Sequence, residues 1–134
     1  MKVIIAGSRD LKFSQLSKMF NLVNKDHNIL KNTTEIVSGN ARGADRFGEL
    51  LAEENEIKLT IFKPDWDQHG KSAGYIRNAE MGKYADMGVI LWDGISKGSL
   101  HMYNYLVRNE IPVILVTIKE DSTKTNIDVD STYL

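Results

Sequence analysis

Three segments of this chain share a pattern that suits the binding of an anion. Each is a short apolar run followed by a turn of glycine, serine and charged residues: GSRD after residues 3–6, SGNARGAD after residues 35–37 and DGISKGS after residues 87–92. Glycine lets a ligand approach the backbone closely, and the free N–H groups at the start of a following helix attract negative charge. The repeated pattern predicts a phosphate site.

Side chains in and near these turns could serve the same ligand. A hydroxyl could come from Ser38, and four cationic groups could neutralise phosphate: Arg9, Arg42, Arg77 and Lys97. Four carboxylates could hold ribose hydroxyls or exchange protons: Asp45, Asp65, Asp67 and Asp93. Three aromatic rings could stack on a base: Trp66, Tyr75 and Trp92.

The carboxylates also have structural interpretations. Asp45 lies in the first turn of an expected helix, where a cap and a ligand contact suit the sequence equally. Asp93 could form an Asx turn, and Asp65 and Asp67 could be ordinary loop residues. The sequence leaves these alternatives open.

Other candidate residues also have both a structural and a ligand-binding interpretation. Trp92 ends an apolar strand, which favours core packing over stacking, whereas Lys97 at a helix start opposes the helix dipole and so supports a bound anion. His101 is favoured as a surface residue over a proton-transfer group, and the histidines are too scattered to predict a metal site. Residues 70–72 read GKS, but the leading glycine of a P-loop is missing, and no GxGxxG follows the first strand.

Alternating strands and helices are expected to position these turns. Apolar runs predict strands at 3–6, 35–37, 58–62, 87–92 and 112–118, and helical spacing predicts helices at 13–24, 44–56, 73–84 and 99–108. This order predicts an α/β fold: a three-layer, Rossmann-like domain with a five-stranded parallel sheet, order 3-2-1-4-5, and helices on both faces. The domain would span residues 1–118, with residues 119–134 forming a partly ordered tail or a short edge strand.

Composition narrows the function. The 134 residues include 42% hydrophobic and 26% charged side chains, with a net charge of −1, which is typical of one globular domain. A pI of about 6.3 argues against stable nucleic-acid binding. The chain has no cysteine, so it has no disulfide or zinc-thiolate site. A strand that begins at Lys2 leaves no room for a signal peptide, and no apolar run reaches membrane-spanning length, so we expect a cytoplasmic protein.

Four motifs carry a family resemblance. GSRD, SGNARGAD, PDWDQHGKSAGYIRN and WDGISKGSLHM together resemble the SLOG superfamily and, within it, the YspA/cpYpsA-related family of small bacterial and phage proteins. The resemblance covers about residues 1–118. It implies a Rossmann-like fold that binds nucleotides or nucleotide-derived ligands, and it implies a homo-oligomer.

The same superfamily includes the Lonely Guy phosphoribohydrolases, which cleave the N-glycosidic bond of a nucleoside monophosphate with an arginine and a glutamate. Arg77 fits the arginine, but Met102 occupies the position of the glutamate. A thioether cannot serve as acid, base or ion-pair partner. If such chemistry occurs here, another acid, Asp45 or Asp93, must replace the glutamate.

The sequence therefore predicts a binder of a nucleotide or nucleotide-derived signal, a sensor or a sequestering sponge, with no cofactor and no metal. The alternative is a nucleoside 5'-monophosphate N-glycosidase with Arg77 and either Asp45 or Asp93 as catalytic residues. The predicted ligand-binding residues are Gly7, Ser8, Arg9, Ser38, Gly39, Ala41, Arg42, Gly43, Asp45, Asp65, Trp66, Arg77, Asn78, Trp92, Asp93, Gly94, Ser96, Lys97, Gly98 and Ser99.

Overall fold

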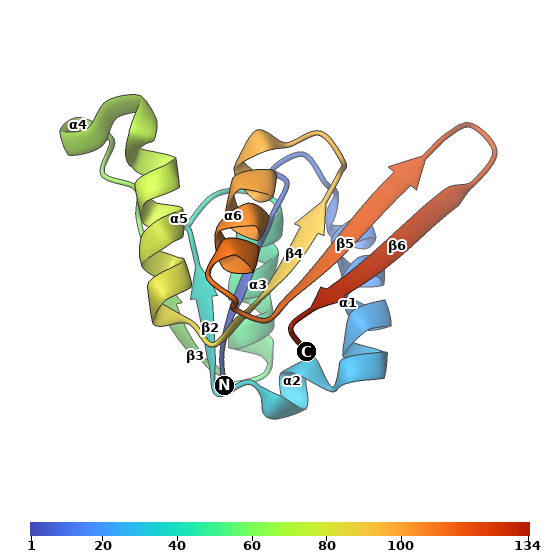
Figure 1. Ribbon diagram of the computed structural model, residues 1–134. Coiled ribbons are helices and arrows are strands. Elements are labelled where there is room, and N and C mark those ends of the chain that lie inside the picture. The colour runs from blue at the N-terminus through green and yellow to red at the C-terminus, as the bar shows by residue number, and fades with distance from the viewer.

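The computed structural model describes residues 1–134 and has one six-stranded sheet in the order β3-β2-β1-β4-β5-β6 (Figure 1). The strands are β1 (Lys2–Gly7), β2 (Glu35–Ser38), β3 (Lys58–Ile61), β4 (Met87–Trp92), β5 (Val113–Glu120) and β6 (Thr125–Thr132). The first five run parallel in the predicted order. The α/β fold class is confirmed.

The predicted number of strands is wrong, because β6 pairs antiparallel with β5 at the edge of the sheet. In this pairing Ile127 lies opposite Ile118 and Val129 opposite Val116. Only these alternate positions of β6 are apolar and most of the strand is exposed, so it lacks the continuous apolar run of a buried strand. Figure 1 shows the β5–β6 hairpin reaching beyond the helical layers.

Helices cover both faces of the sheet. One face carries α1 (Phe13–His27) and α3 (Ala44–Glu54), and the other carries α5 (Ala73–Tyr84) and α6 (Lys97–Arg108) (Figure 1). Neighbouring residues of β1 point to opposite faces. Ile5 accordingly belongs to the core with Leu16 and Phe20, and Ile4 to the core with Met81.

Short helices complete the chain: α2 (Ile29–Asn32), α4 (Trp66–His69) and a 3-10 turn at Gly70–Ser72. The sequence did not predict α4, whose start is capped by Asp65 accepting a hydrogen bond from the Gln68 N–H at 3.0 Å. Helix α6 begins earlier than predicted because Ser96 is its N-cap. No helix has both the length and the apolar character to cross a membrane.

The strands β1 and β4 end side by side, and the candidate binding site lies beyond their ends. Gly7 pairs with Leu91, and a Cβ atom on Gly7 would lie 1.9 Å from the Leu91 carbonyl oxygen, so only glycine fits there. Beyond this point the chain leaves β1 for α1 on one face and leaves β4 for α6 on the other. Such a switch point opens a crevice at the carboxyl ends of the strands.

Candidate functional site

A cavity of about 300 Å³ lies at these strand ends, and we call it the inner cavity. It is lined by residues from β1 and the turn after it, the β2–α3 turn, the start of α3, α5 and the first half of α6: Ala6, Gly7, Arg9, Ala41, Asp45, Arg77, Asn78, Met81, Ser96, Gly98, Ser99 and Met102. Its volume is at the lower end of the range for small-molecule sites. The side chains of Ala6, Met81 and Met102 form an apolar floor. Apart from Ala41, the other lining residues are glycine, polar or charged.

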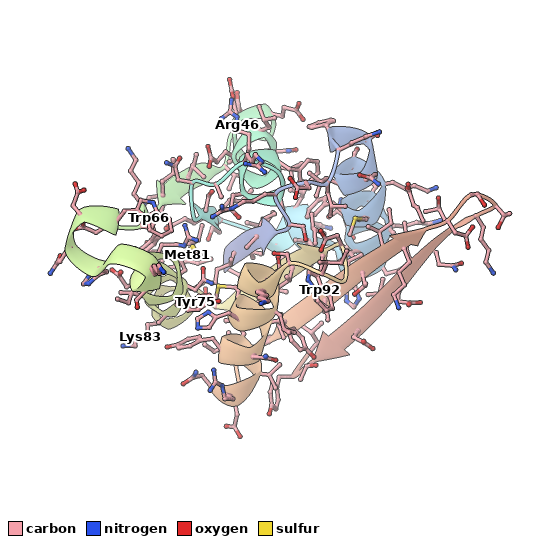
Figure 2. The ribbon with its side chains drawn as sticks, turned by 90° about the horizontal axis from the view of Figure 1, so that it is seen from above. Arg46, Trp66, Tyr75, Met81, Lys83 and Trp92 are labelled. Atoms are coloured by element: carbon pink, nitrogen blue, oxygen red, sulfur yellow. The ribbon has the colours of Figure 1, made fainter.

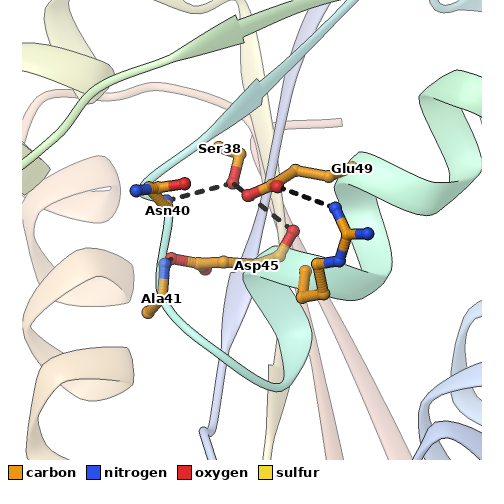
Figure 3. A network of polar contacts seen from close by, with 6 residues as sticks. Ser38, Asn40, Ala41, Asp45 and Glu49 are labelled. Carbon is orange, nitrogen blue, oxygen red and sulfur yellow. Dashed lines mark hydrogen bonds and ion pairs between the residues drawn. The ribbon is translucent and has the colours of Figure 1, made fainter.

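Asp45 is the buried acid of the inner cavity. It is only 4% exposed, and its Oδ2 accepts a hydrogen bond from the Ala41 N–H at 3.1 Å, which holds the β2–α3 turn against the helix (Figure 3). Burial raises the pKa of Asp45 to about 6, although the Ala41 N–H and the Arg77 charge both oppose the rise. A carboxyl group with this pKa can donate or accept a proton near neutral pH.

Arg77 faces Asp45 across Gly39. Its guanidinium is buried, its Nη1 donates to the Gly39 carbonyl oxygen, and its Nε donates to Asn78 Oδ1 at 3.1 Å. A Cβ atom on Gly39 would lie 2.9 Å from both Arg77 Nη1 and Asp45 Oδ2, so the missing side chain is what admits the two groups. Burial lowers the pKa of Arg77, and the nearby Arg9 charge lowers it further, whereas Asp45 opposes both.

Ser38 belongs to an internal network and not to the cavity wall. Its Oγ donates to Glu49 Oε2 at 2.8 Å and accepts from the Asn40 N–H at 3.2 Å (Figure 3). Glu49 Oε1 also pairs with Arg46 at 3.3 Å. The sequence predicts that the Ser38 hydroxyl contacts a phosphate. In the structure this hydroxyl instead stabilises the turn that carries Ala41.

Asp93 likewise has a structural role. Its Oδ1 accepts from the N–H groups of Ile95 and Ser96, both at 2.9 Å, which is the Asx turn left open by the sequence. Burial alone would raise the pKa of Asp93, but these hydrogen bonds and the one with Ser8 outweigh it and hold the pKa below its ordinary value. Asp93 stays ionised near neutral pH and does not line the inner cavity.

The start of α6 presents a free backbone group to the inner cavity. Ser96 caps the helix by accepting from the Ser99 N–H at 3.4 Å, and its carbonyl oxygen accepts from Trp92 Nε1 at 2.9 Å. The N–H group of Gly98, which lines the cavity, makes no hydrogen bond within the chain. It remains available to an anion at the positive end of the helix dipole.

A second concavity of about 290 Å³, which we call the outer hollow, adjoins the inner cavity. The two share Arg9, Ala41 and Arg77, and the outer hollow adds Gly39, Asn40, Arg42, Pro64 and Trp66. Trp66 is 52% exposed. The ion pair between Arg42 and Asp10, at 2.8 Å, is solvent-exposed and therefore weak, so Arg42 can turn to another anion.

His101 and Tyr75 join α5 to α6 beside the site. Their rings stack with centroids 4.1 Å apart, and Asn78 Nδ2 lies 3.2 Å from His101 Nδ1. Burial lowers the pKa of His101, and the Arg108 charge adds to the effect. Figure 2 shows Tyr75 and Trp66 on one side of α6 and Trp92 on the other. Neither Tyr75 nor His101 lines either concavity.

The structure brings together more than half of the predicted ligand-binding residues. Those in the inner cavity are Gly7, Arg9, Ala41, Asp45, Arg77, Asn78, Ser96, Gly98 and Ser99. Those that line only the outer hollow are Gly39, Arg42 and Trp66. Those that line neither are Ser8, Ser38, Gly43, Asp65, Trp92, Asp93, Gly94 and Lys97.

The sequence missed the cavity floor of Ala6, Met81 and Met102, together with Asn40 and Pro64 in the outer hollow. A helical-face argument could have found the methionines. Met81 follows Arg77 by four residues on α5, and Met102 follows Ser99 by three on α6, spacings that place side chains on one face.

Comparison with known proteins gives the family. Residues 1–69 match the model of the "YspA, cpYpsA-related SLOG family". The gene 61 protein of Mycobacterium phage D29 is 35% identical over 85 residues, which cover 59% of this chain and 68% of that protein. The chain belongs to the YspA/cpYpsA-related SLOG family.

Solved structures show the same fold. DNA processing protein A (DprA) from Streptococcus pneumoniae aligns over 92% of this chain with a TM-score of 0.68 and 18% identity, and this chain spans 52% of that one. DprA from Helicobacter pylori, whose structure describes a single-stranded DNA binding mode, aligns over 94% of this chain and 68% of its own, with a TM-score of 0.64 and 18% identity.

The DprA comparison corrects one expectation. The acidic pI predicts no stable nucleic-acid binding, yet H. pylori DprA, which contains this fold, binds single-stranded DNA. Net charge describes the whole surface, whereas binding depends on local charge. Here Arg9, Arg42 and Arg77 gather in one hollow despite a net charge of −1. The prediction of no nucleic-acid binding was wrong because it relied on the net charge of the whole chain and not on the local charge of one surface.

Proposed function

We propose that this protein binds a nucleotide or a nucleotide-derived signalling molecule in the inner cavity, as a sensor or a sequestering protein. One observation carries the proposal: Arg9, Arg77, a buried acid and the start of α6 converge on a single cavity at the switch point of the sheet. Sites of this kind in α/β folds take ligands with phosphate groups.

The phosphate would lie between the start of α6 and the two arginines. The unpaired N–H group of Gly98 supplies a donor on one side, and Arg9 supplies charge on the other. Arg77 has its Nη1 and Nε already engaged with Gly39 and Asn78, so its guanidinium is held in place before a ligand arrives. A preorganised donor loses less entropy on binding.

The sugar or base would contact the deeper residues. Asp45 can accept from ribose hydroxyls or donate to a base, depending on its protonation. Asn78 offers an amide, and the floor of Met81 and Met102 offers apolar, polarisable contact. This mixture of an apolar floor and a few polar groups is typical of small-molecule sites.

The test is a ligand panel with two readouts. Purified protein is incubated with nucleoside mono-, di- and triphosphates, cyclic nucleotides, ADP-ribose derivatives and short single-stranded oligonucleotides. Melting temperature reports binding, and chromatography reports whether the ligand survives. We expect at least one nucleotide to raise the melting temperature and to be recovered intact; no shift with any of them would contradict the proposal.

A second candidate function is favoured by the raised pKa of Asp45, and it is hydrolysis of a nucleotide N-glycosidic bond. In that reaction the bond from C1′ to the base nitrogen breaks, water adds its oxygen to C1′, and one proton passes to the base. Asp45 would exchange that proton and Arg77 would hold the phosphate. The Asx turn and lowered pKa of Asp93 argue against Asp93 in this role.

The same chromatography separates the two functions. A hydrolase releases free base from the wild-type protein, and Asp45→Asn abolishes the release while the ligand still binds. A binding protein leaves the ligand intact in both cases. Asp93→Asn serves as the matched control, because that carboxylate lies outside the inner cavity.

A further inference from the structure

We infer that the ligand has two nucleoside halves joined by a phosphate bridge, with one half in the inner cavity and the other stacked on Trp66 in the outer hollow. The inference rests on the proposed function and deepens it. It names the class of ligand, a linear dinucleotide, and it assigns a second subsite.

The two concavities are continuous. The inner cavity of about 300 Å³ and the outer hollow of about 290 Å³ have Arg9, Ala41 and Arg77 in common. Each concavity alone is at or below the lower limit of the usual range for small-molecule sites. A ligand that fills both must pass these shared residues.

The charge at the shared wall also favours a bridging anion. Arg9 lies close enough to Arg77 to lower its pKa, Asp45 is the one acid that lines the inner cavity beside them, and no acid lines the outer hollow. Two cations that face a single carboxylate keep an excess of positive charge, which favours an anion between them. The bridge of a dinucleotide carries its charge at that position, midway between its two bases.

The lining of the outer hollow suits a nucleotide. No acidic side chain lines it, and it combines three arginines with the apolar surfaces of Pro64 and Trp66. Cationic groups beside an exposed aromatic ring are the elements from which proteins build single-nucleotide subsites, because the phosphate pairs with the cation and the base stacks on the ring.

Trp66 is held in place although it is not a core residue. It is 52% exposed on the short helix α4, whose first turn is capped by Asp65. Its ring also lies against α5 at Gly74, where an added Cβ atom would be 3.7 Å from the ring. A large aromatic ring that is ordered yet exposed is suited to stacking on a ligand.

The experiment compares ligands with one and two halves. The probes are the four nucleoside 5'-monophosphates, the corresponding linear dinucleotides with a single bridging phosphate, NAD, and an oligothymidylate of twelve nucleotides. Calorimetric titration is made with wild type, with Trp66→Ala and with the control Tyr133→Ala, which removes a ring of the same 52% exposure outside both concavities.

We expect a dinucleotide or NAD to bind at least tenfold more tightly than the matching monophosphate. Trp66→Ala should remove that gain and leave the affinity for the monophosphate unchanged, and Tyr133→Ala should change neither. Because Trp66 and Tyr133 are both 52% exposed, melting temperatures near that of wild type are expected for both variants.

Other outcomes overturn the inference in distinct ways. Equal affinity for one and two halves, with no effect of Trp66→Ala, overturns the second subsite and leaves the proposed function intact. Loss of monophosphate affinity in Trp66→Ala would mean that Trp66 contacts the first half. Binding of the oligonucleotide without binding of any dinucleotide or NAD assigns the surface to nucleic acid. No binding of any probe contradicts the proposed function itself.

Discussion

Asp45 shows how one residue couples stability to function. Its carboxyl group is buried beside Arg77 at a cavity wall and has a pKa of about 6 against an ordinary value of 3.8. The folded protein therefore binds this proton more tightly than the unfolded chain does. This difference favours folding at low pH, and the advantage is lost as the pH rises from about 4 through about 6.

We predict that Asp45→Asn stabilises the ligand-free protein at pH 7.5. A rise of the pKa from 3.8 to about 6 corresponds to roughly 3 kcal/mol, which wild type loses between pH 4 and pH 7 and the asparagine variant does not. Urea unfolding of both proteins at several pH values measures the difference. The amide can still accept from the Ala41 N–H, so a difference that does not change with pH would contradict the prediction.

Asp93→Asn is a control for which we expect the opposite change in the free energy of unfolding. The folded state lowers the pKa of Asp93, so its ionised form stabilises the fold above its unfolded pKa, and that stability is lost as the pH falls through the folded pKa. This variant should be less stable than wild type at pH 7.5, and the gap should close in acid.

Substitution of Gly39 tests whether the close approach of Arg77 and Asp45 matters for binding. An alanine Cβ would lie 2.9 Å from Arg77 and from Asp45, so one of the two side chains must move. We predict that Gly39→Ala weakens binding of the nucleotide selected by the panel by at least tenfold, about 1.4 kcal/mol. Calorimetric titration checks the affinity, and an unchanged affinity would show that this geometry does not matter for binding.

At the scale of elements, the site depends on the close approach of α5 and α6. An added Cβ atom on Gly82 would lie 2.3 Å from the Tyr105 ring, so the two helices meet where α5 has no side chain. These helices carry Arg77, Asn78 and Ser99 to the inner cavity. Their separation therefore sets its width.

We predict that Gly82→Ala lowers the free energy of unfolding by about 1–3 kcal/mol, because overpacking must displace a ring or a helix. The matched control is Gly98→Ala on α6, where nothing lies within 4 Å of the added atom. That change should leave stability unchanged or raise it by about 0.5–1 kcal/mol through helix propensity. Urea unfolding of both variants measures the contrast, and equal losses would contradict it.

Much of this element-level arrangement follows from local sequence. The continuous apolar runs of β1 and β4 predict buried parallel strands, and the turns after them predict a crevice at the switch point. The roles of Ser38 and Asp93 could not be assigned in this way. The bond from Ser38 to Glu49 spans eleven residues and requires α3 to be docked first, and Asp93 has equally good chemistry for a turn or a ligand.

At the scale of the whole molecule, the β5–β6 hairpin lies apart from the site. Residues of the inner cavity and outer hollow come from β1, the turn after it and the segments from β2 to α6, and none comes from β5 or β6. The sequence did not settle the state of this region because β6 gains its structure from pairing with β5 rather than from a core of its own. The homo-oligomer stays a prediction, which light scattering tests.

We predict that Ile127→Ala lowers stability by about 1–2 kcal/mol and leaves ligand affinity unchanged, because Ile127 packs beside Ile118 at the edge of the core. Val129→Ala, at an exposed position of the same strand, should cost less than about 0.5 kcal/mol. A loss of affinity in Ile127→Ala would show that the hairpin takes part in binding.

The central claim is that the inner cavity binds the phosphate of a nucleotide, and the most direct test is a titration of wild type, Arg9→Gln and Arg108→Gln with the nucleotide selected by the panel. Arg9 lines both concavities and makes no ion pair, whereas Arg108 is exposed at the far end of α6. Removal of a charged hydrogen-bond donor to phosphate should weaken binding at least tenfold in Arg9→Gln. Arg108→Gln should bind like wild type. Equal affinity of all three proteins would contradict the account.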